Sequence, residues 1–194
     1  MADPIFNAKK AALINIVKEN DCSYANFINE NGNSYADLAG MLFSMAKEFD
    51  CNPLYLDQLF SPFDDADLIS NGIYYNKSAT TITNPKYVAK CTNVDVVVNA
   101  GGDYPILEIA HGSEVNDLTV SGNTIIEALT VGGGSEVNTL EVEDGSVINS
   151  LYVKGCNTYN SSISLIKQGS TINYIYVADD ATITKIECEI NPIV

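Results

Sequence analysis

Few side chains in this sequence are of the kinds that do chemistry, and their spacing does not assemble a catalytic site. The only histidine, His111, sits among repeat positions, so a Ser-His-Asp triad is not predicted. The five cysteines lie far apart with no Cys-x-x-Cys pair, so no zinc site is expected and the thiols are predicted to be free. We expect no metal and no cofactor, and we predict that the protein is not an enzyme.

Two acidic pairs, Glu143-Asp144 and Asp179-Asp180, come nearest to a carboxylate mechanism. A glycosidase needs two carboxylates across a cleft, and residues adjacent in sequence do not provide that geometry. β-Helix polysaccharide lyases combine acids with arginine or lysine, and this sequence contains no arginine. We interpret both pairs as solvated turns, and a polysaccharide-acting β-helix enzyme is the third function considered.

A group of tyrosines near the C-terminus could bind a surface glycan by stacking on sugar rings, because an aromatic ring offers an apolar face and a polar edge. Packing between neighbouring strands, or a contact between subunits, explains the same residues equally well. A glycan-binding receptor or adhesin module is therefore the alternative function. The tyrosines are Tyr152, Tyr159, Tyr174 and Tyr176.

An eleven-residue repeat, running from Val96 to the C-terminus, must position these groups. Its template is Leu-x-Val-x-x-Gly-Ser-x-Val-Asn-x, and the first and third positions alternate with polar residues, as in a half-buried strand. The Gly-Ser pairs predict turns. The asparagine that follows the ninth position predicts a second corner, since asparagine tolerates the left-handed region. These asparagines are Asn116, Asn138, Asn149 and Asn173.

Each unit is therefore expected to supply a strand, a turn, a short apolar segment and a second corner. Eleven residues cannot hold two packed helices, and recurrent glycine disfavours a coiled coil of the same period. The pattern predicts a β-solenoid with two units, about 22 residues, per coil, or a β-prism whose layers several chains share. Four coils would rise only about 19 Å. Open sheet edges invite pairing, so we expect a homo-oligomer, a trimer or a dimer.

The whole chain is predicted to have an α+β fold: a small N-terminal helical module in residues 1–61, a connector in 62–94 and a β-solenoid of eleven-residue repeats in 95–194. Caps and helical spacing indicate three short helices in the first part. This module is expected to cap the first coil, to dock onto a partner protein, or to do both. The predicted helices run from Asp3 to Glu19, from Ser34 to Phe49 and from Pro53 to Phe60.

The charge of the chain limits the kinds of molecule that it can bind. The chain carries 25 acidic residues against ten lysines, a net charge of −15, so direct nucleic-acid binding is not expected. Residues 95–194 hold fourteen acids and three lysines. Any anchoring contact with an acidic partner surface is therefore expected in the first half, at Lys9, Lys10, Lys18 and Lys47. Solvated faces of the predicted helices are the other interpretation of these lysines. The sequence shows no signal peptide and no membrane span, which predicts a protein made in the cytoplasm.

The repeat ladder LTVGGGSEVNTLEVEDGSVINSLYV, from Leu129 to Val153, resembles the repetitive β-structure of tailed-bacteriophage fibres and virion decoration proteins. The resemblance covers about the last hundred residues. Adhesin passenger domains and bactofilin-like filaments have the same kind of repeat pattern. It implies a structural virion appendage, a head or tail fibre or a decoration subunit. The helical half would anchor it to other virion or assembly proteins, and the acidic β-stack would project outward.

Overall fold

The computed structural model describes residues 57, 60–61, 63–156, 159–169 and 171–188. The chain divides into two compact units, Met1–Asn71 and Gly72–Val194. The first two predicted helices and the four anchoring lysines lie outside the described residues. Of the third predicted helix only Asp57 and Phe60 are described, and both are helical.

The one complete helix in the described part of the first unit is α5 (Asp65–Ser70), which lies where the sequence predicted a connector. Asp64 is its N-cap, and the Asp64 carboxylate accepts a hydrogen bond from the Asp67 amide at 2.8 Å. This bond satisfies one of the amides that the first helical turn leaves without a partner. Leu68 is the buried residue of this short helix.

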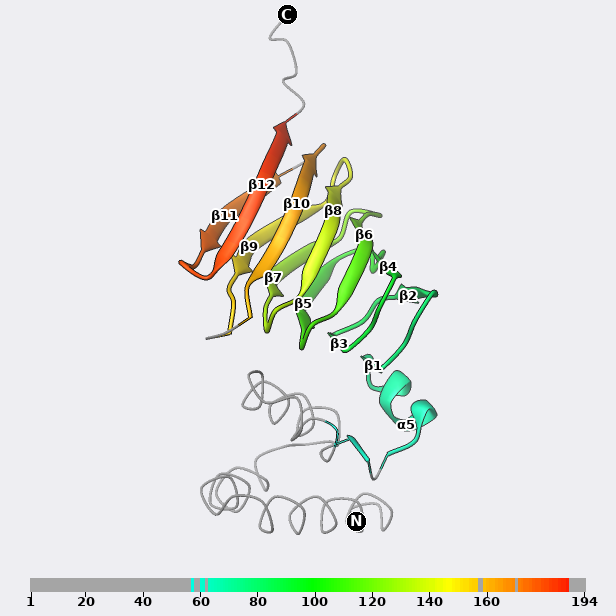
Figure 1. Ribbon diagram of the computed structural model, residues 1–194. Helices are drawn as coiled ribbons and strands as arrows, with labels where there is room; N and C mark the ends of the chain where they lie inside the picture. Colours follow the sequence, from blue (N-terminus) through cyan, green and yellow to red (C-terminus); the bar gives the residue numbers. More distant parts are fainter. Residues whose placement is uncertain (1–56, 58–59, 62, 157–158, 170, 189–194) are drawn as a thin grey trace, which may run out of the picture. The chain divides into compact units, whose positions relative to one another are not determined.

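The second unit is a β-solenoid, as the repeat predicted (Figure 1). Odd-numbered strands form one six-stranded parallel sheet, and even-numbered strands form a second. We call these the odd sheet and the even sheet. The strands are β1 (Ile73–Tyr75), β2 (Thr81–Thr83), β3 (Tyr87–Ala89), β4 (Val94–Val98), β5 (Asp103–Ala110), β6 (Glu114–Val120), β7 (Ile125–Val131), β8 (Glu136–Val142), β9 (Val147–Val153), β10 (Ser161–Gln168), β11 (Thr171–Val177) and β12 (Ala181–Cys188).

Each coil consists of two repeat units from a single chain, which confirms the solenoid and not the shared-layer prism. Leu118 in β6 lies in register with Leu140 in β8, and Leu129 in β7 lies in register with Leu151 in β9. Both pairs are 22 residues apart, so identical repeat positions stack directly on one another. The regular strands β5 to β12, two to a coil, make about four turns.

The stacking begins earlier than the repeat can be recognised. Strands β1 to β4 pair in the same two sheets, although β1 to β3 fall within residues 62–94, where a connector was predicted. These first three strands have only three residues each. Their corners use Asn76, Asn84 and Lys90 at positive φ in place of the Gly-Ser pair, so the template does not reveal them.

The predicted second corner at the repeat asparagines is wrong. Asn116 lies inside the continuous strand β6, and no repeat asparagine of the template has a positive φ. The alternation of inward and outward side chains is instead interrupted within the strand, where Asn116 and Asp117 both face outward between buried Val115 and Leu118. One strand therefore serves both inward positions, and each unit has a single corner.

The core lies between the two sheets and is a stack of aliphatic side chains. Val115, Leu118 and Val120 of β6 are fully buried or nearly so, and their counterparts in β8 are fully buried as well. The predicted turns are confirmed at Gly112 and Gly134, which hold φ values of +68° and +80° at the corners. Because this core is stacked in register, the outward side chains stand in columns on the two sheet faces.

Candidate functional site

Three of the four predicted tyrosines come together on the outer face of the odd sheet. The Tyr152 ring lies 6.2 Å from Tyr174 and 6.3 Å from Tyr176, measured between ring centroids. Tyr152 and Tyr176 are direct register partners in β9 and β11. Tyr174 and Tyr176 are about half exposed. We call these three residues the tyrosine cluster, and its exposed rings could stack on an apolar sugar face.

Tyr159 does not join this cluster. It lies in the corner between β9 and β10, where its backbone exchanges hydrogen bonds with Cys156. Its Cβ packs so close to Gly134 that a side chain on that glycine would clash with it. The sequence grouped Tyr159 with the others because it follows Tyr152 closely, but the corner separates the two.

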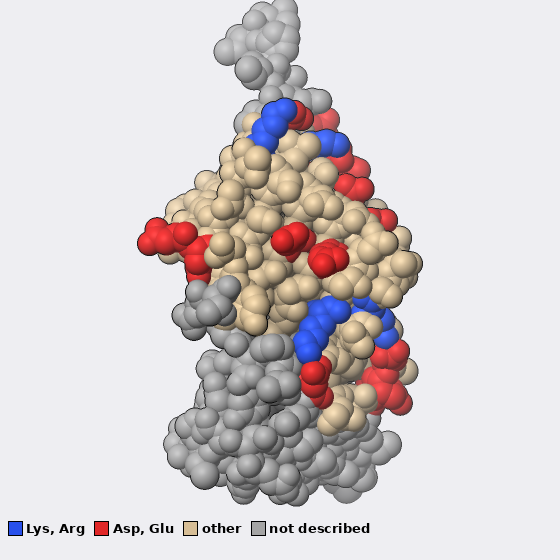
Figure 2. Space-filling model, viewed as in Figure 1, with Lys and Arg blue, Asp and Glu red and all other residues tan. Residues whose placement is uncertain are grey.

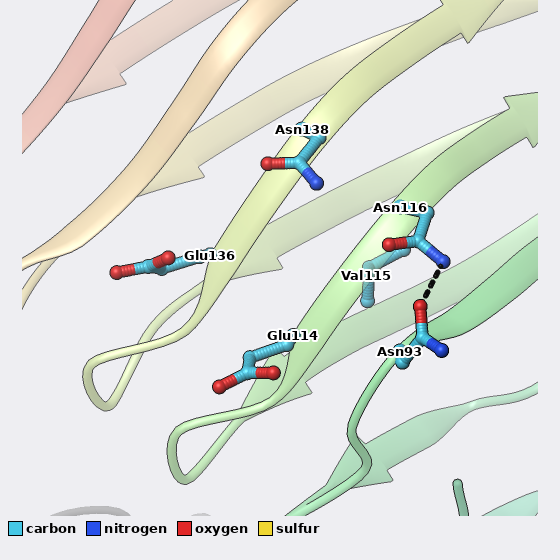
Figure 3. Close-up of a pocket in the computed structure, with 6 residues that line it drawn as sticks. All are labelled: Asn93, Glu114, Val115, Asn116, Glu136 and Asn138. Atoms are coloured by element: carbon cyan, nitrogen blue, oxygen red, sulfur yellow. Dashed lines mark hydrogen bonds between the residues drawn. The ribbon is translucent and has the colours of Figure 1, made fainter. Parts of the chain in front are cut away.

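A shallow polar groove of about 120 Å³ lies on the outer face of the even sheet (Figure 3). Glu114 and Glu136 line one side and are register partners in β6 and β8. Asn93, Asn116 and Asn138 form a column on the other side. The side-chain amide nitrogen of Asn116 donates a hydrogen bond to the side-chain oxygen Oδ1 of Asn93 at 2.8 Å.

Carboxylate and amide oxygens of this kind can bind a hard cation or the hydroxyls of a sugar. Both glutamates are exposed, and like charges directly opposite each other on neighbouring strands repel. Among the residues that the structure describes, no group of three or more His, Cys, Asp or Glu could hold a metal ion. The sequence did not single out this groove, because its residues are ordinary repeat positions that only the coil brings together.

The serine of the Gly-Ser pair, which the sequence assigned only to a turn, is a buried connector between coils. Ser113 Oγ accepts a hydrogen bond from the Cys91 amide at 3.3 Å and donates to the Ala110 carbonyl at 2.8 Å. Ser135 Oγ accepts from the Ser113 amide at 3.2 Å, and Ser161 Oγ accepts from the Gly134 amide at 3.0 Å. Ser161 follows Asn160 and is not part of a Gly-Ser pair, but it makes the equivalent contact at the next corner. We call Ser113, Ser135 and Ser161 the serine ladder. All three are fully buried.

His111 occupies the predicted corner and has a φ of +54°, but its side chain is buried and not solvated. Its ring lies 6.5 Å from the Tyr87 ring in an edge-to-face arrangement. Glu108, the register partner of Tyr87, is also buried. None of the three is without a partner. The sequence missed this cluster because Glu108 occupies an outward position that normally faces solvent.

The acidic pairs lie at corners, as predicted. Glu143 and Asp144 are exposed between β8 and β9. Asp179 is exposed between β11 and β12, whereas Asp180 is partly buried and accepts a hydrogen bond from the Gly155 amide at 2.8 Å. These carboxylates therefore belong to corners, and one of them has a structural hydrogen bond.

The cysteines follow the prediction only in part. Cys91 is a free, buried thiol, and burial raises its pKa. A buried thiol with a raised pKa is a poor nucleophile at neutral pH. Cys156, in contrast, is disulfide-bonded, so the prediction of free thiols throughout is wrong for this residue. The side chain of its partner is not among those described.

No protein-family model, no curated protein and no solved structure matches this chain. The class of the protein is therefore defined by its own geometry: a parallel β-solenoid with two strands per coil and a mainly aliphatic core. Within the described residues, no helix is long and apolar enough to cross a membrane.

Proposed function

We propose that this chain is a non-enzymatic structural subunit of a virion appendage, a fibre or decoration protein. In this proposal the N-terminal residues anchor the subunit to other particle proteins, and the solenoid projects outward as an acidic spacer. The protein is made in the host cytoplasm and reaches the virion by assembly. The proposal extends the repeat's resemblance to phage fibres and decoration proteins.

The observation that carries the proposal is the continuity of the solenoid. The aliphatic core runs without a break from β2 to β10, and the buried serine ladder ties successive coils together at one corner. Because each coil rests on its neighbours over its whole length, the stack resists bending better than a chain of loops. Such a body suits a spacer that holds its outer end away from a surface.

The charge of the solenoid surface supports the same role. The charged side chains on the face drawn in Figure 2 are mostly acidic, in keeping with the fourteen acids and three lysines of residues 95–194. A surface of one sign keeps neighbouring spacers apart and prevents nonspecific adhesion to other acidic surfaces.

The test of this role is sedimentation of particles from cells that produce the chain. Full-length protein should migrate with the particles in a density gradient and resist a high-salt wash. A fragment of residues 72–194, which retains the whole solenoid, should stay in the soluble fraction because it lacks the anchoring residues. Full-length protein found only in the soluble fraction would refute the proposal.

Glycan binding by the tyrosine cluster is the second candidate, and the exposure of Tyr174 and Tyr176 is the observation that favours it. The test is a glycan array probed with the wild type and with Tyr174→Ala/Tyr176→Ala. Tyr159→Ala is the matched control, because Tyr159 is equally exposed but lies away from the cluster. Saturable binding that is lost only in the double variant would establish a receptor role. An empty array, or equal loss in the control, would remove this candidate.

A further inference from the structure

The solenoid has an open end at its last coil, formed by β11 and β12. Both strands are the outermost members of their sheets, and no described strand pairs with their free edges. Each edge presents a row of backbone amides and carbonyls available for hydrogen bonding. The two sheets therefore end together, and the core between them ends at the same level.

The side chains of this last coil are exposed at positions that are buried elsewhere. Val177 is 42% exposed, whereas its register partner Val153 is fully buried. Ile186 is 45% exposed, whereas its register partner Ile166 is fully buried. Both residues occupy core positions of the repeat, so the last coil leaves apolar side chains exposed that the next coil would bury in the interior of the stack. Exposed apolar area joined to unpaired edges is typical of an interaction surface.

We propose that a second copy of this chain covers this end, with β11 pairing with β11 of the second copy and β12 with its β12. Pairing around a two-fold axis is antiparallel in both sheets. It gives a closed dimer with one continuous core. The proposal goes beyond the structural role above, and it can succeed or fail independently of that role.

The pattern of inward residues fits this two-fold pairing in both strands. β11 turns Ile172, Ile175 and Val177 toward the core, and β12 turns Ile183 and Ile186 toward the core; the two isoleucines are three residues apart in each strand. An axis through the midpoint of each pair places Ile183 opposite Ile186 of the second copy. An axis that also passes through the midpoint of the β11 pair places Ile172 opposite Ile175 of the second copy. Antiparallel partners face the same side of a sheet, so all four isoleucines enter the shared core.

The distribution of charge also favours a second copy. In a chain of net charge −15, β11 contains no charged residue, and the charges of Lys185 and Glu187 in β12 cancel. Lys185 and Glu187 also form an ion pair within the strand. Two copies can therefore approach through this end without the repulsion that the acidic faces would cause.

The acidic corner selects between the two ways of placing the axis. An axis perpendicular to the sheets pairs like strands and puts the corners that hold Asp179 and Asp180 at opposite ends of the interface. An axis parallel to the strands would pair β11 with β12 of the second copy and bring the two acidic corners together. Like charges across an interface are unfavourable, so the first arrangement is the one proposed.

The test is light scattering on purified full-length protein over a range of concentrations, with Ile186→Lys as the disrupting variant. The wild type should have a mass of about 41.8 kDa, twice the 20.9 kDa of one chain, with no further growth at high concentration. Ile186→Lys should have half that mass, because a lysine would be buried in the shared core. Ser164→Lys is the control, since Ser164 is exposed on β10, one coil inward, and its variant should keep the wild-type mass.

A wild-type monomer, a trimer, or a mass that rises steadily with concentration would overturn the proposal, the last by indicating head-to-tail stacking. A dimer that Ile186→Lys leaves intact would also overturn it. Hydrogen exchange on the wild type needs no variant to fold. Dilution should speed exchange in β11 and β12 and leave β6 to β8 unchanged, and equal behaviour of both regions while the mass falls would contradict the interface. A failed particle-sedimentation test would leave these outcomes unaffected, so the two proposals are distinguishable.

Discussion

At the scale of single residues, glycine occupies the corner position of the repeat for two separable reasons. Gly112 and Gly134 both hold positive φ, where any other residue is strained. A Cβ on Gly112 would meet nothing within 4 Å, whereas a Cβ on Gly134 would lie 2.6 Å from the Cβ of Tyr159. Gly112 is therefore required for its backbone conformation alone, and Gly134 for conformation and space together.

Alanine at the two positions should separate these effects. We expect Gly112→Ala to lower the free energy of unfolding by about 1 kcal/mol, the usual cost of left-handed backbone for alanine. Gly134→Ala should cost on the order of 2–3 kcal/mol, because the Tyr159 backbone must also shift. Urea denaturation of both variants measures the difference, and equal costs would show that the corner yields freely at Tyr159.

Tyr104 makes the stability of the folded solenoid depend on pH in the alkaline range. Its hydroxyl donates a hydrogen bond to the Pro85 carbonyl at 2.6 Å, and burial, with a smaller effect of Tyr74, raises its pKa from 10 to about 12. The pKa is higher in the folded than in the unfolded protein. The stabilisation is therefore complete below pH 10 and is lost as the pH rises toward 12.

We expect the stability difference between wild type and Tyr104→Phe to shrink by about 2 kcal/mol between pH 9 and pH 11.5, at about 1.4 kcal/mol per pKa unit. Urea denaturation of both proteins at pH 9, 10 and 11.5 measures it. The Phe variant cannot ionise and serves as its own control for other alkaline effects. A difference that does not change with pH would mean that Tyr104 ionises normally.

At the scale of elements, the serine ladder holds one coil against the next. Removing the Ser113 hydroxyl leaves the buried Cys91 amide without that acceptor, and an unsatisfied buried donor costs about 1–3 kcal/mol. We therefore expect Ser113→Ala to lower the free energy of unfolding by that amount. Ser164→Ala, at an exposed position, should change it by less than about 0.5 kcal/mol. Thermal or urea unfolding measures the free energy of unfolding of both variants. If Ser113→Ala left that free energy unchanged, the serine ladder would not contribute to stability.

The sequence predicts the strands and turns best at repeat positions where the same kind of residue recurs and always has the same structural role. Apolar first and third positions predict the strands, and the eleven-residue period predicts the 22-residue coil. The repeat asparagines mislead, because the break in alternation is absorbed inside a continuous strand such as β6 and needs no corner. The strands β1 to β3 escape notice because three-residue strands are too short to show a period.

The candidate sites are less predictable than the strands, because they depend on which coils become neighbours. Tyr152, Tyr174 and Tyr176 could be grouped from their outward positions, and the structure brings them together. Glu114 and Glu136 are 22 residues apart, so only the stacking of coils places them in one groove. Burial of Glu108 and His111 on an outward face has no signal in the repeat at all.

At the scale of the whole molecule, the solenoid behaves as a one-dimensional stack whose stability is the sum of coils and of contacts between neighbouring coils. Interior coils are covered on both sides, and the last coil is covered on one side only, as the exposure of Ile186 records. A stack of this length gains stability by covering its open end. The proposed spacer role and the proposed dimerisation at the open end are therefore both argued from the same architecture.

The copy number of the chain in purified particles is the most direct test of the proposed role as a structural part of a particle. Quantitative mass spectrometry of salt-washed particles should find the chain at a fixed ratio to an abundant particle protein. Pairing through the open end further predicts an even number of copies per particle. Absence of the chain from washed particles, or a ratio that varies between preparations, would contradict the structural role.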